Sequence, residues 1–166
     1  MHRNIEDLQY HRSRLLLLTR KLKKVIAEHY QQSYACLLTV PGIGPITAIA
    51  FLAETGDLSR FGDPDEFCSY LGLVPSEQSS GARVYSTCIQ PRCNRHLLPL
   101  LIEAAWTAIR RCPVLLTYYR KHAGKNNKKV IVKVARKLAL IAKAVALKKQ
   151  AYQAEYNYQL NVIRED

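Results

Sequence analysis

The stretch from residue 34 to residue 55 constrains the fold most, because two apolar runs flank a turn of unusual chemistry. The turn reads Pro-Gly-Ile-Gly-Pro. Gly42 and Gly44 allow backbone conformations that other residues avoid. Pro45 suits the first turn of a helix, where its missing N–H group costs nothing. The stretch therefore predicts a short apolar helix, a tight turn and a second apolar helix.

The same turn carries a binding signature. Its pattern, hydrophobic-x-Gly-hydrophobic-Gly, is that of a helix-hairpin-helix motif and is formed by Val40, Gly42, Ile43 and Gly44. The free N–H groups at a helix start can hold a phosphate, and such hairpins grip the DNA backbone without reading bases. Gly42, Ile43 and Gly44 are thus candidate DNA contacts. The alternative is a helical corner that only packs.

Helical periodicity runs through most of the remaining chain. The first helix, over residues 4–30, has a narrow leucine stripe close to a heptad repeat; it either pairs as a coiled coil, giving a homo-oligomer, or packs on its own domain. An Asp63–Pro64 start and Gly72 bound a short helix. Further helices are expected at 98–111, 113–122 and 128–149.

The expected fold class is mainly α. It comprises a helical domain with a helix-hairpin-helix motif, a short extended or hairpin segment near 82–89, and a coiled-coil-like N-terminal helix. The expected division is residues 1–33 for that helix, 34–150 for the helix-hairpin-helix domain and 151–166 for a C-terminal tail.

Positive charge is concentrated in one segment. The net charge is +12, and residues 81–150 hold 16 basic residues against one acidic residue, Glu103. Such a segment favours an anionic partner, with nucleic acid first and an acidic membrane surface or a merely solvated face as alternatives. Within the 128–149 helix, four basic residues lie opposite the apolar stripe and form a candidate phosphate-binding face: Lys129, Lys133, Arg136 and Lys143.

Several protein classes are excluded by what the sequence contains. Its apolar runs fall short of a membrane span, and its N-terminus does not have the pattern of a signal peptide. The five cysteines are an odd number without a CxxC pair, which argues against a disulfide framework or a zinc ribbon and fits a reducing cytoplasm. Cys88, Cys93 and His96 lack a convincing metal-site spacing, so we expect no metal or other cofactor in this chain.

Five short motifs occur in an order that resembles a known family. They are Pro-Gly-Ile-Gly-Pro at 41–45, Gly-Asp-x-Ser-Arg-Phe at 56–61, Tyr-x-Gly-Leu-x-Pro-Ser-Glu at 70–77, Ser-Ser-Gly at 79–81, and Asn-Arg-x-Leu followed by Glu-Ala-Ala at 94–105. From Leu37 to Ala151 the chain resembles the C-terminal transposase domain of the insertion-sequence-110 family of bacterial transposases, which includes the Piv-type DNA invertases.

The resemblance implies a DNA recombinase built from two parts. An N-terminal RuvC-like domain would hold divalent metal, expected to be magnesium, on four acidic residues. The C-terminal domain would supply a serine that attacks DNA, and some members use a structured guide RNA. On this reading Ser80 is the first choice for the nucleophile and Ser79 the alternate, while three arginines are candidates to neutralise the phosphate: Arg83, Arg92 and Arg95.

The sequence departs from the family in ways that bear on activity. Its 13 acidic residues do not form the ligand set that the RuvC-like domain needs, Cys93 stands where glycine is usual, and Pro99 stands where a basic residue is common. Our hypothesis is that the isolated chain binds nucleic acid but does not cut or join it; strand transfer by the pure chain with magnesium would overturn this. The alternatives are a non-catalytic helix-hairpin-helix DNA-binding module and a truncated transposase remnant.

Overall fold

The structure is a computed structural model, and it describes residues 2–80, 83–89, 93–124 and 126–154. The elements are, in order, α1 (His2–His29), α2 (Gln31–Leu37), α3 (Pro45–Thr55), the 3-10 turn η1 (Leu58–Arg60), α4 (Pro64–Leu71), β1 (Pro75–Ser80), β2 (Arg83–Ile89), α5 (Leu97–Arg111), α6 (Pro113–His122) and α7 (Asn127–Lys148). The expected mainly α fold is confirmed. No helix within the described part of the chain has the length and apolar character that a membrane span requires.

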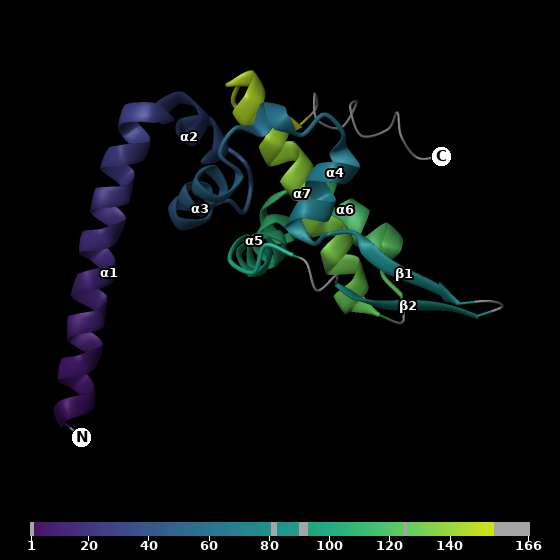
Figure 1. Ribbon diagram of the computed structural model, residues 1–166, viewed down its shortest axis with the longest axis horizontal. Helices are drawn as coiled ribbons and strands as arrows, with labels where there is room; N and C mark the ends of the chain where they lie inside the picture. Colours follow the sequence, from purple (N-terminus) through teal and green to yellow (C-terminus); the bar gives the residue numbers. More distant parts are fainter. Residues whose placement is uncertain (1, 81–82, 90–92, 125, 155–166) are drawn as a thin grey trace.

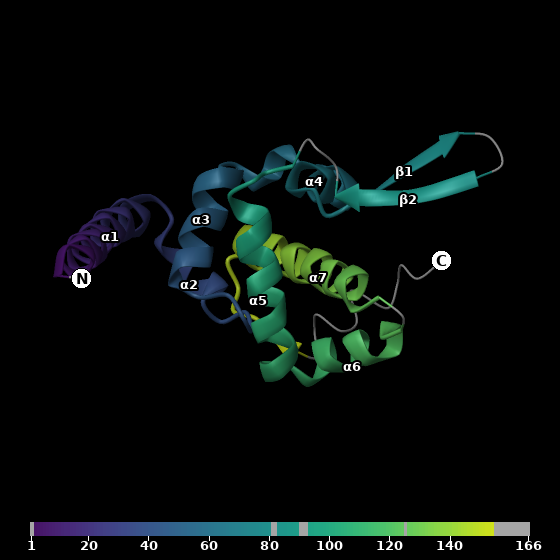
Figure 2. The ribbon, with the colours of Figure 1, turned by 90° about the horizontal axis from the view of Figure 1, so that it is seen from below.

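Helix α7 is the centre of the body. It contacts α2, α4, α5, α6 and η1, and Figure 2 shows it running beneath α4 and beside α5. Both α5 and α7 carry small residues in the core, since Ala105 and Ala108 of α5 and Ala135 and Ala139 of α7 are completely buried. A helix covered on so many sides stays apolar around most of its circumference. The start of α7 is capped by Asn126, whose side chain accepts a hydrogen bond from the Lys129 N–H group.

The ends of α4 follow the expected chemistry. The Asp63 carboxylate accepts a hydrogen bond from the Asp65 N–H group at 3.0 Å, and Pro64 occupies the first turn. Gly72 ends the helix in a left-handed conformation, with φ of +76°. The Asp63–Pro64 start and the Gly72 stop are therefore both confirmed.

The two helices expected around the Pro-Gly-Ile-Gly-Pro turn are present as α2 and α3. The connecting residues are held by the Ile43 N–H group, which donates to the Val40 carbonyl oxygen at 3.1 Å. Both of these side chains lie in the hydrophobic core. Pro45 is the first residue of α3, as expected. The turn is thus a packed part of the body.

Strands β1 and β2 form an antiparallel two-stranded hairpin that projects from the helical body (Figures 1 and 2). The extended segment expected near residues 82–89 corresponds to β2, which starts at Arg83. The sequence did not indicate β1, because its residues, PSEQSS, lack the alternation of apolar and polar side chains that predicts a strand. Its backbone pairs with that of β2 along the whole strand.

Helix α1 leaves the body as a long projecting rod (Figure 1). Among its described side chains only Ile26 is buried, while Leu8, Leu15 and Leu22 are 67%, 65% and 47% exposed. The leucine stripe allowed two interpretations, pairing with another helix or packing on the chain's own domain. The second is therefore wrong for most of the helix. The stripe is available to another helix.

Candidate nucleic-acid interface and serine hairpin

The turn between α2 and α3 divides its three candidate DNA contacts between two environments. Gly42 has φ of +88° and packs against α5, where a Cβ atom would overlap the Ala104 carbonyl oxygen and lie 2.8 Å from the Ala108 nitrogen. Ile43 is buried in the core. Gly44 has open space around it and precedes α3, whose start has no side-chain cap. The outward part of the turn is therefore Gly44 and the first N–H groups of α3, which can accept an anion.

The basic face expected on α7 is shorter than the sequence suggested. Lys129 and Lys133, in the first two turns, are exposed. Arg136 is two-thirds buried and pairs with Asp65 of α4. Lys143 is only 9% exposed. Placing all four on one solvent-facing surface was wrong for Lys143, because α4 and η1 cover the side of α7 that the helical period assigns to solvent.

Lys143 is a structural lysine in this fold. Its Nζ atom donates to the Phe61 carbonyl oxygen at 2.7 Å and lies 5.3 Å from the centre of the Phe67 ring. A buried ammonium group needs such partners, here a carbonyl oxygen and the negative face of an aromatic ring. Lys143 therefore ties η1 and α4 to α7 instead of facing a ligand.

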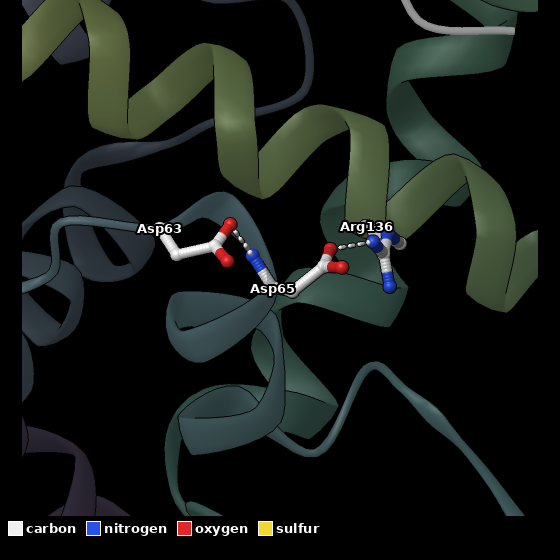
Figure 3. A network of polar contacts seen from close by, with 3 residues as sticks. All are labelled: Asp63, Asp65 and Arg136. Carbon is white, nitrogen blue, oxygen red and sulfur yellow. Dashed lines mark hydrogen bonds and ion pairs between the residues drawn. The ribbon is translucent and has the colours of Figure 1, made fainter. Parts of the chain in front are cut away.

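A short polar network holds Arg136 (Figure 3). Asp63 caps the backbone of Asp65, and the Asp65 carboxylate pairs with the Arg136 guanidinium group. Because the Asp65 side chain is 71% exposed, water screens the pair, and it contributes no more than about 1 kcal/mol. An arriving phosphate could compete for Arg136, but in the free protein this arginine joins the start of α4 to α7.

The candidate serines lie at the far end of the hairpin. Ser80 is directly opposite Arg83, and Ser79 is directly opposite Val84. Arg95 lies in the chain beyond the other end of β2, and β2 itself, with seven residues, spans about 20 Å. The fold thus pairs Ser80 with Arg83 and separates both from Arg95, while Arg92 lies outside the described residues.

A side-chain cluster that the sequence reading did not assign to the site lies at the base of the hairpin. The Asn94 Nδ2 group donates to Glu54 Oε2 at 2.8 Å, and the Tyr70 hydroxyl group donates to the Glu54 carbonyl oxygen at 2.7 Å. The Asn94 Oδ1 atom accepts from the N–H groups of His96 and Leu97. The sequence did contain a signal for the capping role of Asn94, because asparagine shortly before an apolar helix is a common N-cap.

Residues 34–120, just over half of the chain, match the family described as transposase IS116/IS110/IS902. The chain belongs to this transposase family. The match begins in α2 and ends in α6, so it includes the turn, the hairpin and the Asn94 cluster.

Individual proteins show the same likeness. A putative transposase, y4qE, of Sinorhizobium fredii is 35% identical over 102 residues, which are 58% of this chain and 26% of that protein. A probable family 20 transposase of Pseudomonas aeruginosa is 41% identical over 76 residues, 46% of this chain and 22% of that protein. The pilin gene-inverting protein of Moraxella bovis is 30% identical over 113 residues, which are 66% of this chain and 35% of that protein. The chain thus spans about a fifth to a third of the length of these relatives.

The described residues of this transposase chain do not offer a metal centre. They include no group of three or more histidine, cysteine or acidic residues that could hold an ion. Cys36, Cys68, Cys93 and Cys112 are free thiols, and burial raises the pKa of the Cys68 thiol from 9.0 to about 11. A thiol of that kind is protonated at neutral pH and is a poor metal ligand. The family resemblance implies magnesium on an acidic N-terminal domain, and the described side chains of this chain do not fit that ion.

Proposed function

We propose that this chain is the DNA-binding, strand-exchange portion of a transposase, in which the β1–β2 hairpin presents Ser80 to a DNA phosphate. The observation that carries the proposal is the strand register, because it gives Ser80 a cationic cross-strand partner, Arg83. Directly opposed residues are neighbours on one face of an antiparallel pair. Ser79 is paired with an apolar residue, Val84. The register therefore favours Ser80 over Ser79 as the nucleophile.

The proposed step is a phosphoryl transfer. The Ser80 hydroxyl group loses its proton as its Oγ atom forms a bond to phosphorus, and one phosphorus–oxygen bond of the DNA backbone breaks. The departing DNA oxygen takes up a proton, so the net proton transfer is from Ser80 to the departing oxygen. A serine hydroxyl group is a weak nucleophile at neutral pH, so the step needs help with both the proton and the charge. Arg83 would neutralise charge on the phosphate oxygens. An acidic metal-binding domain, which the family resemblance implies, would act together with this chain.

The helical body supports a role in holding the nucleic acid. No acidic residue occurs between Glu103 and Glu155, whereas 13 lysines and arginines do. Exposed basic residues gather where α6 ends and α7 begins, namely Arg120, Lys121, Lys128, Lys129 and Lys133. Phosphate contacts of this kind supply affinity without sequence information. Duplex DNA is the proposed partner, and a structured guide RNA is a second nucleic acid that the same charges suit.

The exposed leucine stripe of α1 supports self-association as part of the proposal. A helix with apolar residues near a 3.5-residue repeat is stabilised when a second helix covers them. Analytical ultracentrifugation should show a concentration-dependent dimer or higher species that Leu15→Glu shifts to monomer. A monomer at all concentrations would contradict this part of the proposal alone.

Covalent trapping tests the chemical role. The chain would be combined with the acidic domain, expressed separately, with magnesium and with DNA flanking the gene that encodes the chain. Strand attack by Ser80 leaves a protein–DNA adduct that survives denaturing electrophoresis, and peptide mapping should locate it at Ser80. Ser80→Ala should abolish the adduct and keep DNA affinity within twofold, while Ser79→Ala should retain it. An adduct that persists in Ser80→Ala would refute the assignment.

A non-catalytic DNA-binding module is the second candidate. It is favoured by the described residues themselves, which form a basic surface but hold no metal-binding cluster. Under this alternative the chain binds DNA, and neither serine variant changes any property of the complex. The trapping experiment separates the two candidates, because only the first predicts an adduct.

A further inference from the structure

The two ends of the β1–β2 hairpin meet at its base. The chain leaves α4 through Gly72 and returns from β2 through Cys93 to Asn94. These ends touch, since a Cβ atom on Gly72 would overlap Cys93 Cβ and lie 3.2 Å from Cys93 Cα. The Asn94 N–H group donates to the Tyr70 carbonyl oxygen at 3.3 Å. The base of the hairpin is therefore a packed junction between α4 and the segment that enters α5.

The Asn94 side chain is the hub of this junction. Its Oδ1 atom accepts from the N–H groups of His96 and Leu97 at 3.0 and 2.8 Å, which caps the turn that opens α5. The orientation of the amide is thereby fixed, and its Nδ2 group points to Glu54 Oε2 at 2.8 Å and to the Tyr70 hydroxyl oxygen at 3.4 Å. Asparagine offers two donors and two acceptor positions on one short side chain, and all are used.

We infer that Asn94 is a positioning residue, which sets the direction in which the serine hairpin leaves the body by clamping its returning end to Glu54 of α3 while capping α5. The consequence for Ser80 rests on the proposed function. An isolated two-stranded hairpin is marginal in water, so its orientation depends on the junction at its base. A tilt of about 10° at the base moves the tip by roughly 3 Å over a strand of about 17 Å. Displacements of about 1 Å can cost a reaction about a hundredfold.

One substitution separates the clamp from the cap. In Asn94→Asp the remaining oxygens can still accept from His96 and Leu97, because aspartate is as good an N-cap as asparagine. The group facing Glu54 changes from a donor to a second carboxylate, which repels the first. Adding Glu54→Gln restores a hydrogen bond at this contact, because the new amide at position 54 can donate to the new carboxylate at position 94. The pair of changes therefore restores the clamp without restoring the native residue.

Hydrogen–deuterium exchange on the whole chain is the first readout. In Asn94→Asp we expect the amides of residues 76–89 to exchange at least fivefold faster, while the first turn of α5 keeps its protection. Asn94→Asp with Glu54→Gln should bring the hairpin amides back to within twofold of the original rates. The matched control is Asn126→Asp, since Asn126 caps α7 with the same chemistry but takes no part in the junction. It should leave hairpin exchange unchanged.

Two results would overturn the inference. One is hairpin exchange in Asn94→Asp that equals that of the original chain. The other is faster exchange that Glu54→Gln fails to reverse, because the repulsion between the two carboxylates would then not be its cause. If Asn94→Asp loses structure generally, exchange becomes faster in α7 as well. In that case the experiment uses Asn94→Ser instead, a variant that keeps a cap but lacks the amide. It should speed hairpin exchange, and unchanged rates in it would equally overturn the inference.

The clamp at Asn94 and the chemistry at Ser80 can be tested separately. Exchange is measured without DNA, so the clamp can hold even if Ser80 never forms an adduct. If the proposed function holds as well, Asn94→Asp lowers adduct formation at least tenfold with DNA affinity within twofold, and Glu54→Gln restores it. Adduct formation that is normal in a variant with a loosened hairpin would overturn the positioning role while leaving Ser80 as the nucleophile.

Discussion

Replacing Gly42 by alanine should destabilise the protein severely, although only one methyl group is added. The residue has φ of +88° and sits against α5. The new Cβ atom would overlap the Ala104 carbonyl oxygen and lie 2.8 Å from both the nitrogen and the Cβ atom of Ala108. These are mostly backbone atoms of a buried helix, so they cannot swing away as the end of a long side chain could. Either the turn or α5 must move.

The size of the effect follows from two independent costs. A non-glycine residue held at positive φ costs about 1–3 kcal/mol, and forcing an extra carbon into a packed core costs about 1–3 kcal/mol. Together they lower the free energy of unfolding by about 2–6 kcal/mol, out of the roughly 5–15 kcal/mol that a domain of this kind has. With a urea dependence of about 2 kcal/mol per molar, the midpoint falls by about 1–3 M.

Urea denaturation followed by circular dichroism measures this shift, and Gly44→Ala is the matched control. Gly44 lies two residues away in the same motif, has φ of −93° and has nothing near its Cβ position. Its replacement should change stability by less than about 1 kcal/mol, because the loss of a glycine at the helix start is partly offset by a less flexible unfolded chain. If Gly42→Ala unfolds at the same urea concentration as the original chain, the packing of the turn against α5 is incorrect.

Three further outcomes are expected. Lys143→Met should lower the free energy of unfolding by about 1–3 kcal/mol, since it leaves the Phe61 carbonyl oxygen without its donor; DNA affinity, measured by fluorescence anisotropy, should not change, and a loss of affinity in the folded variant would contradict a purely structural role. Lys129→Ala with Lys133→Ala should reduce the slope of log affinity against log salt by about 1.8, the value for two lost phosphate contacts; an unchanged slope would remove this surface from the interface. Burial raises the pKa of Cys68 from 9.0 to about 11, so the unfolded chain loses this proton first, and the stability that the buried thiol contributes is complete below pH 9 and is lost as the pH rises to 11. The urea midpoint should therefore fall less between pH 8 and pH 10.5 in Cys68→Ala than in the original chain. An equal fall in both proteins would show that the thiol does not titrate in this way.

Local signals in the sequence specify most of the helices. Asp63 with Pro64 and the left-handed Gly72 define α4 from caps alone, and the period of apolar residues is enough for α7. These signals succeed because capping and amphipathic patterns involve residues within one or two turns of each other. They describe an element but not its surroundings.

The errors have a common physical origin in contacts between distant residues. Lys143 falls on the polar side of a helical wheel, yet the segment around Phe61, some eighty residues earlier, covers it. Strand β1 has a polar sequence and forms through backbone pairing with β2. The register that sets Ser80 opposite Arg83 is likewise a property of two strands together. No local pattern contains such information.

Binding of the purified chain to duplex DNA, measured from about 50 to about 200 mM salt, tests the central claim most directly. The affinity of phosphate contacts depends strongly on salt in this range. The account predicts that log affinity falls linearly with log salt and that Arg83→Ala weakens binding at every salt concentration with a slope lower by about 0.9. Absence of binding at the lowest salt, or binding that salt does not weaken, would contradict it. The basic residues would then face solvent only, and the hairpin would present its serine to something other than a DNA phosphate.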